Sequence, residues 1–234
     1  DFVPSPDGRR VAYILSRNGA DWGEIRILDV DAPEAPIALL PNIRFEGPMQ
    51  WSADGEGLVY RRFAPPRDGR PEAPAEDPAL YLHRLGTPVA DDPRLFSLPE
   101  DRRDWSLGFD LPGDRRKLFA SVERGPWNDG NLGGSRAQLH LIELEASGHP
   151  RKGAPARVLT EPDAAYRVLH VEADRALVFT DKDAPRRRVV WMDLGDPAPA
   201  RWQPVIPEGE GVLTNAQWYG GRLVAHWIEN VHSV

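Results

Sequence analysis

The sequence contains no cysteine, only three lysines and no run of 18 apolar residues. Without cysteine the chain can hold neither a disulfide framework nor a thiolate metal site, and it has no thiol nucleophile. The lack of a long apolar run argues against a membrane-spanning helix, and no charged-then-apolar leader predicts a signal peptide. We therefore expect a soluble protein, and the composition does not choose between a cytoplasmic and a periplasmic one.

The charge balance limits the expected partners. Lys and Arg number 29 against 36 Asp and Glu, which gives a net charge of -7 and a pI of about 5.4. An acidic chain is not expected to bind nucleic acid, because the phosphate backbone attracts basic surfaces. Three lysines among 29 basic residues leave 26 arginines, a bias that we attribute to codon composition rather than to function.

Proline and glycine, by contrast, are abundant. They number 24 and 21, so 45 of the 234 residues interrupt regular structure. No segment of 12 residues shows the periodicity of an amphipathic helix. So many breakers favour short elements joined by turns over long helices.

A tight turn followed by a short apolar segment recurs along the chain. The clearest copies are the Ser-x-Asp-Gly turns at residues 5–8 and 52–55, and weaker copies lie at 112–114, 173–174 and 220–221. From Asp7 the corresponding turn residues follow at intervals of 47, 60, 60 and 47 residues. A unit of about 50 residues with several strands is typical of the blades of a β-propeller.

Further strands are expected around these turn-and-strand units. The strand before the turn is expected at residues 45–51, 105–111, 166–171 and 211–218. The third strand is expected at residues 24–30, 79–85, 138–144 and 188–194, and the fourth at 37–40, 94–98, 157–159 and 203–206. The sequence thus predicts an all-β chain of four four-stranded antiparallel blades and half of a fifth, with an ordinary β-sandwich as the alternative.

Few residues carry recognisable chemistry. No serine lies in G-x-S-x-G, and the nearest approach, around Ser135, is in a loop with no helix after it. The histidines show no metal-ligand spacing, so neither a metal nor a cofactor is expected. We interpret acidic pairs such as Asp91 and Asp92 as solvated turns. The histidines on predicted strands, which we expect to be partly exposed, are His83, His140, His170 and His226.

Loops and tryptophans offer two other signals. Residues 64–78 form a Pro-rich charged stretch and residues 124–136 a Gly-rich one, and loops of this length are often functional. Trp22 and Trp127 are expected in loops, where an exposed aromatic side chain can mark a binding surface. The remaining tryptophans that lie on or beside predicted strands are interpreted as core residues.

Several segments resemble the prolyl oligopeptidase (prolyl endopeptidase) family of serine peptidases. They are residues 21–26, residues 83–88 with the acidic pair at 91–92, residues 182–188, and residues 220–224 with the closing 229–233. These segments occur in family order across nearly the whole chain. The resemblance implies a seven-bladed propeller that caps an α/β-hydrolase domain, in which the Ser-Asp-His triad resides.

On this resemblance, residues 1–234 are a partial β-propeller domain, and the hydrolase domain with its triad is absent from the chain. The parent would cleave short proline-containing peptides after proline, with no nucleic acid or membrane as partner, and this chain alone would be inactive. No catalytic or metal-binding residue is therefore assigned here. The family places five substrate-facing positions at Phe45, Trp105, Ser106, Glu123 and Pro126, and residues 64–78 in the position of a loop that gates peptide access.

Two other functions remain open from the sequence. A stand-alone propeller could serve as a scaffold that binds a peptide or protein partner, since a fold does not fix a function. The chain could also come from an oligopeptidase B-like or dipeptidyl-peptidase-like enzyme, and basic-residue specificity would then replace proline specificity. A downstream G-x-S-x-G with later Asp and His residues would decide between these hypotheses about the parent protein.

Overall fold

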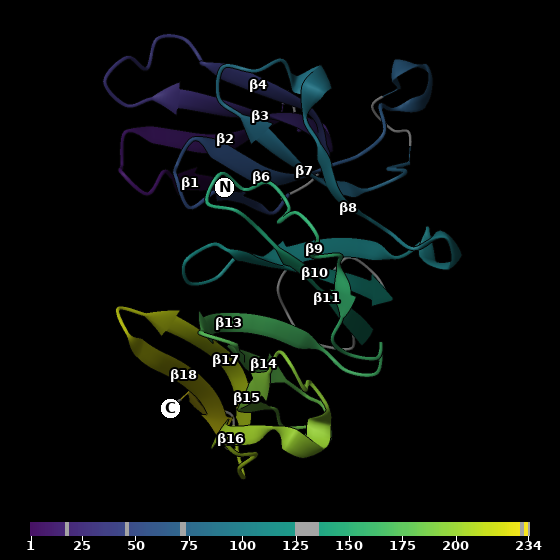
Figure 1. The fold of residues 1–234 in the computed structure, drawn as a ribbon, viewed down its shortest axis with the longest axis vertical. Coiled ribbons are helices and arrows are strands. Elements are labelled where there is room, and N and C mark those ends of the chain that lie inside the picture. Colours follow the sequence, from purple (N-terminus) through teal and green to yellow (C-terminus); the bar gives the residue numbers. More distant parts are fainter. Residues whose placement is uncertain (17–18, 45–46, 71–73, 125–135, 230–231, 234) are drawn as a thin grey trace. The chain divides into compact units, whose positions relative to one another are not determined.

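The computed structural model describes residues 1–16, 19–44, 47–70, 74–124, 136–229 and 232–233, and it consists of short β-strands joined by turns (Figure 1). The helical segments in these ranges are 3-10 turns of three residues each: Arg67–Gly69, Val89–Asp91, Glu100–Arg102 and Pro199–Arg201. Among the described residues, no helix has the length and apolarity needed to cross a membrane. The prediction of an all-β chain is confirmed.

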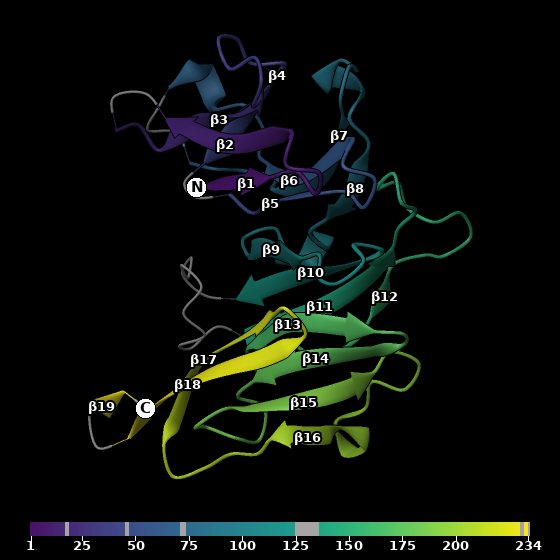
Figure 2. The ribbon, with the colours of Figure 1, turned by 90° about the vertical axis from the view of Figure 1, so that its left-hand side faces the viewer.

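The strands form five antiparallel sheets whose strands follow one another in chain order (Figure 2). The first two sheets are β1 (Phe2–Pro4), β2 (Arg10–Ser16), β3 (Trp22–Asp29) and β4 (Ala38–Arg44), then β5 (Met49–Trp51), β6 (Gly57–Arg62), β7 (Ala79–Arg84) and β8 (Arg94–Ser97). The third sheet is β9 (Ser106–Asp110), β10 (Lys117–Arg124), β11 (Arg136–Glu143) and β12 (Arg157–Val158). The last two are β13 (Tyr166–Glu172), β14 (Arg175–Thr180), β15 (Arg188–Asp193) and β16 (Gln203–Ile206), then β17 (Val212–Tyr219), β18 (Arg222–Glu229) and β19 (His232–Ser233).

This arrangement matches the predicted blades, with differences at the two ends of the chain. No strand was placed before the first turn, where the structure has β1. The expected fifth blade stopped after two strands, whereas the structure adds the two-residue β19, which pairs with β18 through Ile228 and Glu229. So short a strand has no alternation of apolar and polar residues that could reveal it. The fold is therefore four four-stranded sheets and one three-stranded sheet.

The Ser-x-Asp-Gly turns are closed by a repeated set of hydrogen bonds. Ser52 Oγ donates to Asp54 Oδ1 at 2.6 Å and accepts from the Gly57 N–H at 2.9 Å. The Glu56 N–H donates to the same Asp54 oxygen at 3.0 Å, and Gly55 takes the positive φ of 72° that the turn requires. Glycine adopts this conformation without the steric cost that other residues incur. The turn at residues 5–8 repeats these contacts with its own serine and aspartate.

Replacing Ser52 by alanine is expected to lower the free energy of unfolding by roughly 1–2 kcal/mol, because the buried Gly57 N–H loses its side-chain acceptor. Urea denaturation of the chain measures this change. Ser16→Ala, at the exposed end of β2, is the matched control and should change the unfolding free energy by less than about 0.5 kcal/mol. Equal effects of the two substitutions would show that the turn network contributes nothing.

The chain folds as two compact units, which are residues 1–108 with 143–154, and residues 109–142 with 155–234. In the first unit, apolar side chains of the first and second sheets form one core. Its largest fully buried members include Trp51, Tyr60, Ile25, Ile27 and Leu40. Ile25 and Ile27 alternate along β3 with more exposed residues, as expected for the two faces of a strand, whereas β6, which carries Tyr60, is buried along nearly its whole length.

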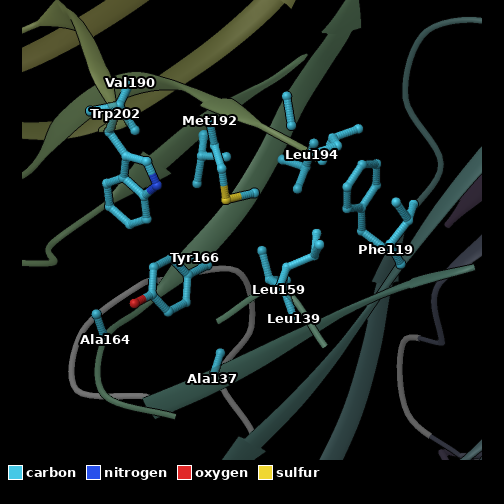
Figure 3. Close-up of a cluster of buried hydrophobic side chains, with 14 residues drawn as sticks. Phe119, Ala137, Leu139, Leu159, Ala164, Tyr166, Val190, Met192, Leu194 and Trp202 are labelled. Atoms are coloured by element: carbon cyan, nitrogen blue, oxygen red, sulfur yellow. The ribbon is translucent and has the colours of Figure 1, made fainter. Parts of the chain in front are cut away.

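The second unit contains two cores. One lies between β10, β11 and the fourth sheet, where Tyr166 and Trp202 meet edge to face at 6.3 Å beside Phe119, Leu139 and Met192 (Figure 3). The other joins the fourth and fifth sheets, and its buried members are Leu177, Phe179, Val189, Leu213 and Ala216. Each face of the fourth sheet therefore packs against a different neighbour, which accounts for its apolar strands.

The position of Trp22 in the first unit differs from expectation. Trp22 was expected in a loop, but it begins β3 and packs edge to face on Phe63 at 6.1 Å, with the Arg44 guanidinium 5.5 Å from its ring. Trp127 lies outside the described residues. The expected loop at 64–78 contains a short 3-10 turn, and the Ala64 N–H donates to Glu76 O at 2.9 Å, so its two ends are tied together.

Candidate functional site on the first strands

The first strands of the sheets carry polar contacts that join neighbouring sheets. In the first unit, Trp51 Nε1 on β5 donates to Val3 O on β1 at 3.0 Å. Arg61 Nη1 on β6 donates to Leu107 O on β9 at 2.7 Å, in a buried position. In the second unit, β17 lies beside β13 in both views (Figures 1 and 2). Polar side chains on these strands are therefore placed where sheets meet.

Asp110 and Arg167 connect three first strands within the second unit. Asp110 Oδ2, at the end of β9, accepts a hydrogen bond from the Val168 N–H on β13 at 3.0 Å. Arg167 Nη2, also on β13, donates to Asn215 Oδ1 at 2.6 Å and to Ala216 O at 2.7 Å, both on β17. These bonds give the unit a row of charged and polar groups along its first strands.

The surroundings shift the pKa of both charged groups. Desolvation raises the pKa of Asp110 to about 6, and the nearby Glu123 carboxylate adds to this, while the Val168 N–H and Arg167 act in the opposite direction. Desolvation also lowers the pKa of Arg167, and the charge of Arg187 lowers it further. An arginine remains protonated in spite of such a shift, so the row keeps its positive charges throughout the physiological range.

Arg187 brings a second guanidinium to the same place. Its Nη1 donates to Thr214 O at 3.3 Å, and its guanidinium lies 5.8 Å from the centre of the buried Phe179 ring, compared with 5.2 Å for Arg167. The β17 ladder is irregular between Leu213 and Asn215, a β-bulge. Bulges redirect side chains and are common beside functional sites. Two guanidiniums from separate parts of the chain thus converge on this bulge.

The described residues show no catalytic relay. Ser147 Oγ lies 3.1 Å from His149 Nδ1 in an exposed turn, and no aspartate among the described residues is bonded to that histidine. A serine nucleophile needs a base that a third group orients. The arrangement on the first strands can bind and orient charged groups, and the described part of the chain offers no means to activate a nucleophile.

Of the five predicted substrate-facing residues, three are described and two, Phe45 and Pro126, lie outside the described residues. Trp105 is half-buried, with the Arg102 guanidinium 4.8 Å from its ring, and Ser106 begins β9. Glu123 is half-buried near the end of β10, where it accepts a hydrogen bond from Ser121 Oγ at 2.6 Å. Trp105 and Ser106 belong to the first unit and Glu123 to the second. Their grouping at a peptide stays a prediction.

A buried polar cluster in the first unit corrects two expectations. Asp92 was interpreted as part of a solvated turn, but its side chain has no exposed surface and accepts a hydrogen bond from Tyr60 Oη at 2.7 Å. His83 was expected to be partly exposed, yet its side chain is 1% exposed and its Nδ1 lies 2.9 Å from the other Asp92 oxygen. His140 is also buried. Burial and the bond to Asp92 raise the pKa of Tyr60 well above its usual value.

The sequence contained a signal for the first-strand row that composition alone does not reveal. Asp110 and Arg167 are charged residues inside otherwise apolar strands, in Leu-Gly-Phe-Asp-Leu and Tyr-Arg-Val-Leu. A charge within a half-buried strand needs a partner or a function. Arg187 had no such signal, because it stands in a run of three arginines beside a loop.

Comparison with known proteins gives a consistent result. A model of the prolyl oligopeptidase N-terminal β-propeller domain matches residues 1–234. A prolyl endopeptidase of Elizabethkingia meningoseptica is 29% identical over 202 residues, which cover 86% of this chain and 26% of that protein. A prolyl endopeptidase of Elizabethkingia miricola is 28% identical over 97% of this chain and 30% of its own length. The chain thus spans less than a third of the relatives that it matches.

Solved structures show the same fold. A structure from a study of two prolyl endopeptidases superimposes with a TM-score of 0.79 at 25% identity, over 99% of this chain and 32% of that one. Prolyl oligopeptidase B of Galerina marginata, bound to a 35-residue substrate of hydrolysis and macrocyclisation, gives 0.82 at 22% identity over 100% of this chain and 32% of its own. At that identity the second likeness concerns the fold alone.

Proposed function

Because the chain belongs to the prolyl oligopeptidase N-terminal β-propeller family, we propose that it is the propeller of a serine peptidase that cleaves short peptides after proline. The catalytic domain is absent from this chain. The observation that carries the proposal is the family match over residues 1–234, which agrees with the five consecutive antiparallel sheets. In this role the propeller restricts the peptides that reach a triad supplied by residues outside the chain.

The polar first strands support a role in peptide selection. A propeller gathers the first strands of its sheets around a central channel, so their side chains face whatever passes along it. In this chain they carry Asp110 and Arg167, with Glu123 close enough to influence the pKa of Asp110. We propose that Phe45, Trp105, Ser106, Glu123 and Pro126 are the substrate-facing positions.

The proposal predicts a sharp difference between the chain and the full-length protein that carries it. The full-length protein should hydrolyse a blocked Gly-Pro amide with a fluorescent leaving group, whereas residues 1–234 alone should release no fluorophore above the buffer rate. The physical reason is that the described residues contain no activated nucleophile, and acyl transfer at neutral pH requires one. Release of the leaving group over time measures both.

Two matched substrates separate the alternatives. The same amide with alanine in place of proline should be cleaved poorly, and the one with arginine in that position should be cleaved poorly as well. Preference for the arginine substrate would favour an oligopeptidase B-like parent, a group represented among proteins of similar fold by an enzyme from Leishmania major with a TM-score of 0.73. Turnover by purified residues 1–234, or none by the full-length protein, would overturn the proposal.

A further inference from the structure

We propose that Arg167 and Arg187 form a carboxylate-binding subsite. This subsite selects peptides that carry an acidic group in addition to the proline. The acid can be a Glu or Asp side chain or the C-terminal carboxylate of the peptide. This inference rests on the proposed peptidase function and deepens it by specifying the substrate. All the groups involved belong to the second unit.

Two like charges, those of Arg167 and Arg187, are held together on β17 without any carboxylate of the described residues in ion-pair contact. Neither guanidinium forms an ion pair with a carboxylate among the described residues, and the hydrogen bonds of both go to β17. Asp110 interacts with Arg167 through its charge, but its hydrogen bond comes from the Val168 N–H. Two guanidiniums in a partly desolvated place repel each other, and a bound anion would remove that repulsion.

Both arginines keep hydrogen-bond donors for a ligand. A guanidinium has five N–H groups in a planar fork that matches a carboxylate. Arg187 uses one nitrogen, on Thr214 O, and Arg167 uses Nη2 for both of its contacts, while its Nε is buried and has no partner. Both side chains are half-buried, so each keeps some surface that a ligand can reach. Charge-assisted bonds of this kind are about twice as strong as neutral ones.

The backbone at Arg187 adopts an uncommon conformation. Its φ is 71°, in the left-handed region where a side chain costs roughly 1–2 kcal/mol. The turn is held by the Arg187 N–H bonded to Ala184 O at 2.7 Å, and by the Leu213 N–H bonded to Arg186 O at 2.9 Å. A strained residue held by its surroundings points to a function for its side chain. Here that residue carries a guanidinium that reaches the β17 bulge through its bond to Thr214 O.

The test measures binding of three blocked hexapeptides that share one proline and differ only at the last residue. One ends in glutamate amide, one in glutamine amide, and one in glutamine with a free carboxylate. Titration calorimetry on the full-length protein, with its catalytic serine replaced by alanine so that the peptides stay intact, should give the glutamate peptide a Kd roughly five- to tenfold lower than that of its amide twin. The third peptide shows whether a C-terminal carboxylate serves as well as a side chain.

Arg187→Gly is the informative variant, because glycine adopts a φ of 71° freely, so the side chain is removed without straining the turn. This variant should bind the three peptides equally, while its melting temperature stays at or above that of the protein without the substitution. Arg167→Gln should also lose the preference, although it removes contacts between β13 and β17. Salt at about 0.5 M should weaken the preference in the parent, since exposed charges are screened.

Two controls match the two effects of the Arg187 substitution. Asp183→Gly relieves a left-handed residue of the same loop, with φ of 49°, and keeps both arginines. Arg175→Gln removes one positive charge from the half-exposed pair with Glu172. Both should retain the preference for glutamate. Equal Kd values for all three peptides in the parent, or a preference that survives Arg187→Gly, would overturn the inference.

Binding and hydrolysis fail independently in this design. If the full-length protein cleaves proline peptides but binds all three hexapeptides equally, the peptidase proposal stands and the carboxylate subsite is wrong. If it cleaves nothing but prefers the glutamate peptide through Arg187, the subsite stands and the peptidase proposal is wrong.

Discussion

Replacing Asp92 by alanine is expected to lower the free energy of unfolding by roughly 3–4 kcal/mol. Its carboxylate accepts from Tyr60 Oη at 2.7 Å and faces His83 Nδ1 at 2.9 Å, and both partners are buried. Removing the carboxylate leaves a hydroxyl and an imidazole in an apolar core without their acceptor. His83 Nε2 already has no partner, so the imidazole would be left without a hydrogen bond at either nitrogen.

Urea denaturation followed by tryptophan fluorescence measures this change, because the fully buried Trp51 belongs to the same unit. Asp91→Ala provides the control, since Asp91 is the exposed neighbour of Asp92 and should change the unfolding free energy by less than about 0.5 kcal/mol. Asp92→Asn, which keeps one acceptor oxygen, should fall between the two. If Asp92→Ala costs no more than its exposed neighbour, the cluster does not stabilise the fold.

Asp110→Asn is expected to stabilise the chain at neutral pH and to flatten its stability between pH 4 and pH 7. The pKa of Asp110 is raised to about 6 in the folded protein from an ordinary value of 3.8, so the folded state holds this proton more tightly than the unfolded state does. The folded state therefore has no penalty from this group at pH 3.5. As the pH rises from about 4 to about 6, the unfolded state loses this proton while the folded state still holds it, so stability falls, and above 6 the penalty stays constant.

The size of this loss follows from the shift. Each pKa unit corresponds to about 1.4 kcal/mol, and partial exposure reduces the effect, so Asp110→Asn should gain about 2 kcal/mol at pH 7.5 and almost nothing at pH 3.5. The difference between variant and parent, measured by urea denaturation at several pH values, isolates this group from the other carboxylates. The amide oxygen of the substituted side chain can still accept the hydrogen bond from the Val168 N–H, which limits the structural change.

Asp174→Asn controls for the loss of one negative charge, because Asp174 is exposed and lies in the same unit. The unfolding free energies of the two variants should diverge as the pH rises from 4 to 7. If the unfolding free energies of Asp110→Asn and of the unsubstituted chain differed by the same amount at every pH, the raised pKa of Asp110 would be contradicted.

The strands and turns could be predicted from the sequence because their signals are local. Gly8, Gly55 and Gly113 take the positive φ values that the recurring turns require, and the strands begin where apolar alternation begins. Ala173 takes the same role in the fourth copy with a φ of 52°, although alanine carries no such signal. There the repeat spacing predicted the turn.

The functional residues were harder to predict because their signals are not local. Asp92 looks like half of a solvated acidic pair until β6 and β7 bring Tyr60 and His83 to it. The role of Arg187 depends on a left-handed backbone and on a bulge in β17, and neither can be read from a run of arginines. Spacing along a sequence identifies strands, whereas contacts between sheets decide which charges are buried.

The discontinuous first unit has a consequence for synthesis of the chain on the ribosome. Residues 143–154 belong to that unit, and the Asp54 N–H donates to Ala146 O at 3.0 Å while Gly148 lies against Ser52 and Leu82. Domains generally fold as units while the chain emerges from its N-terminus. The first unit must therefore wait for a segment that emerges only after residues 109–142 of the second, so a chaperone that shields nascent chains would have two unfinished units to protect at once.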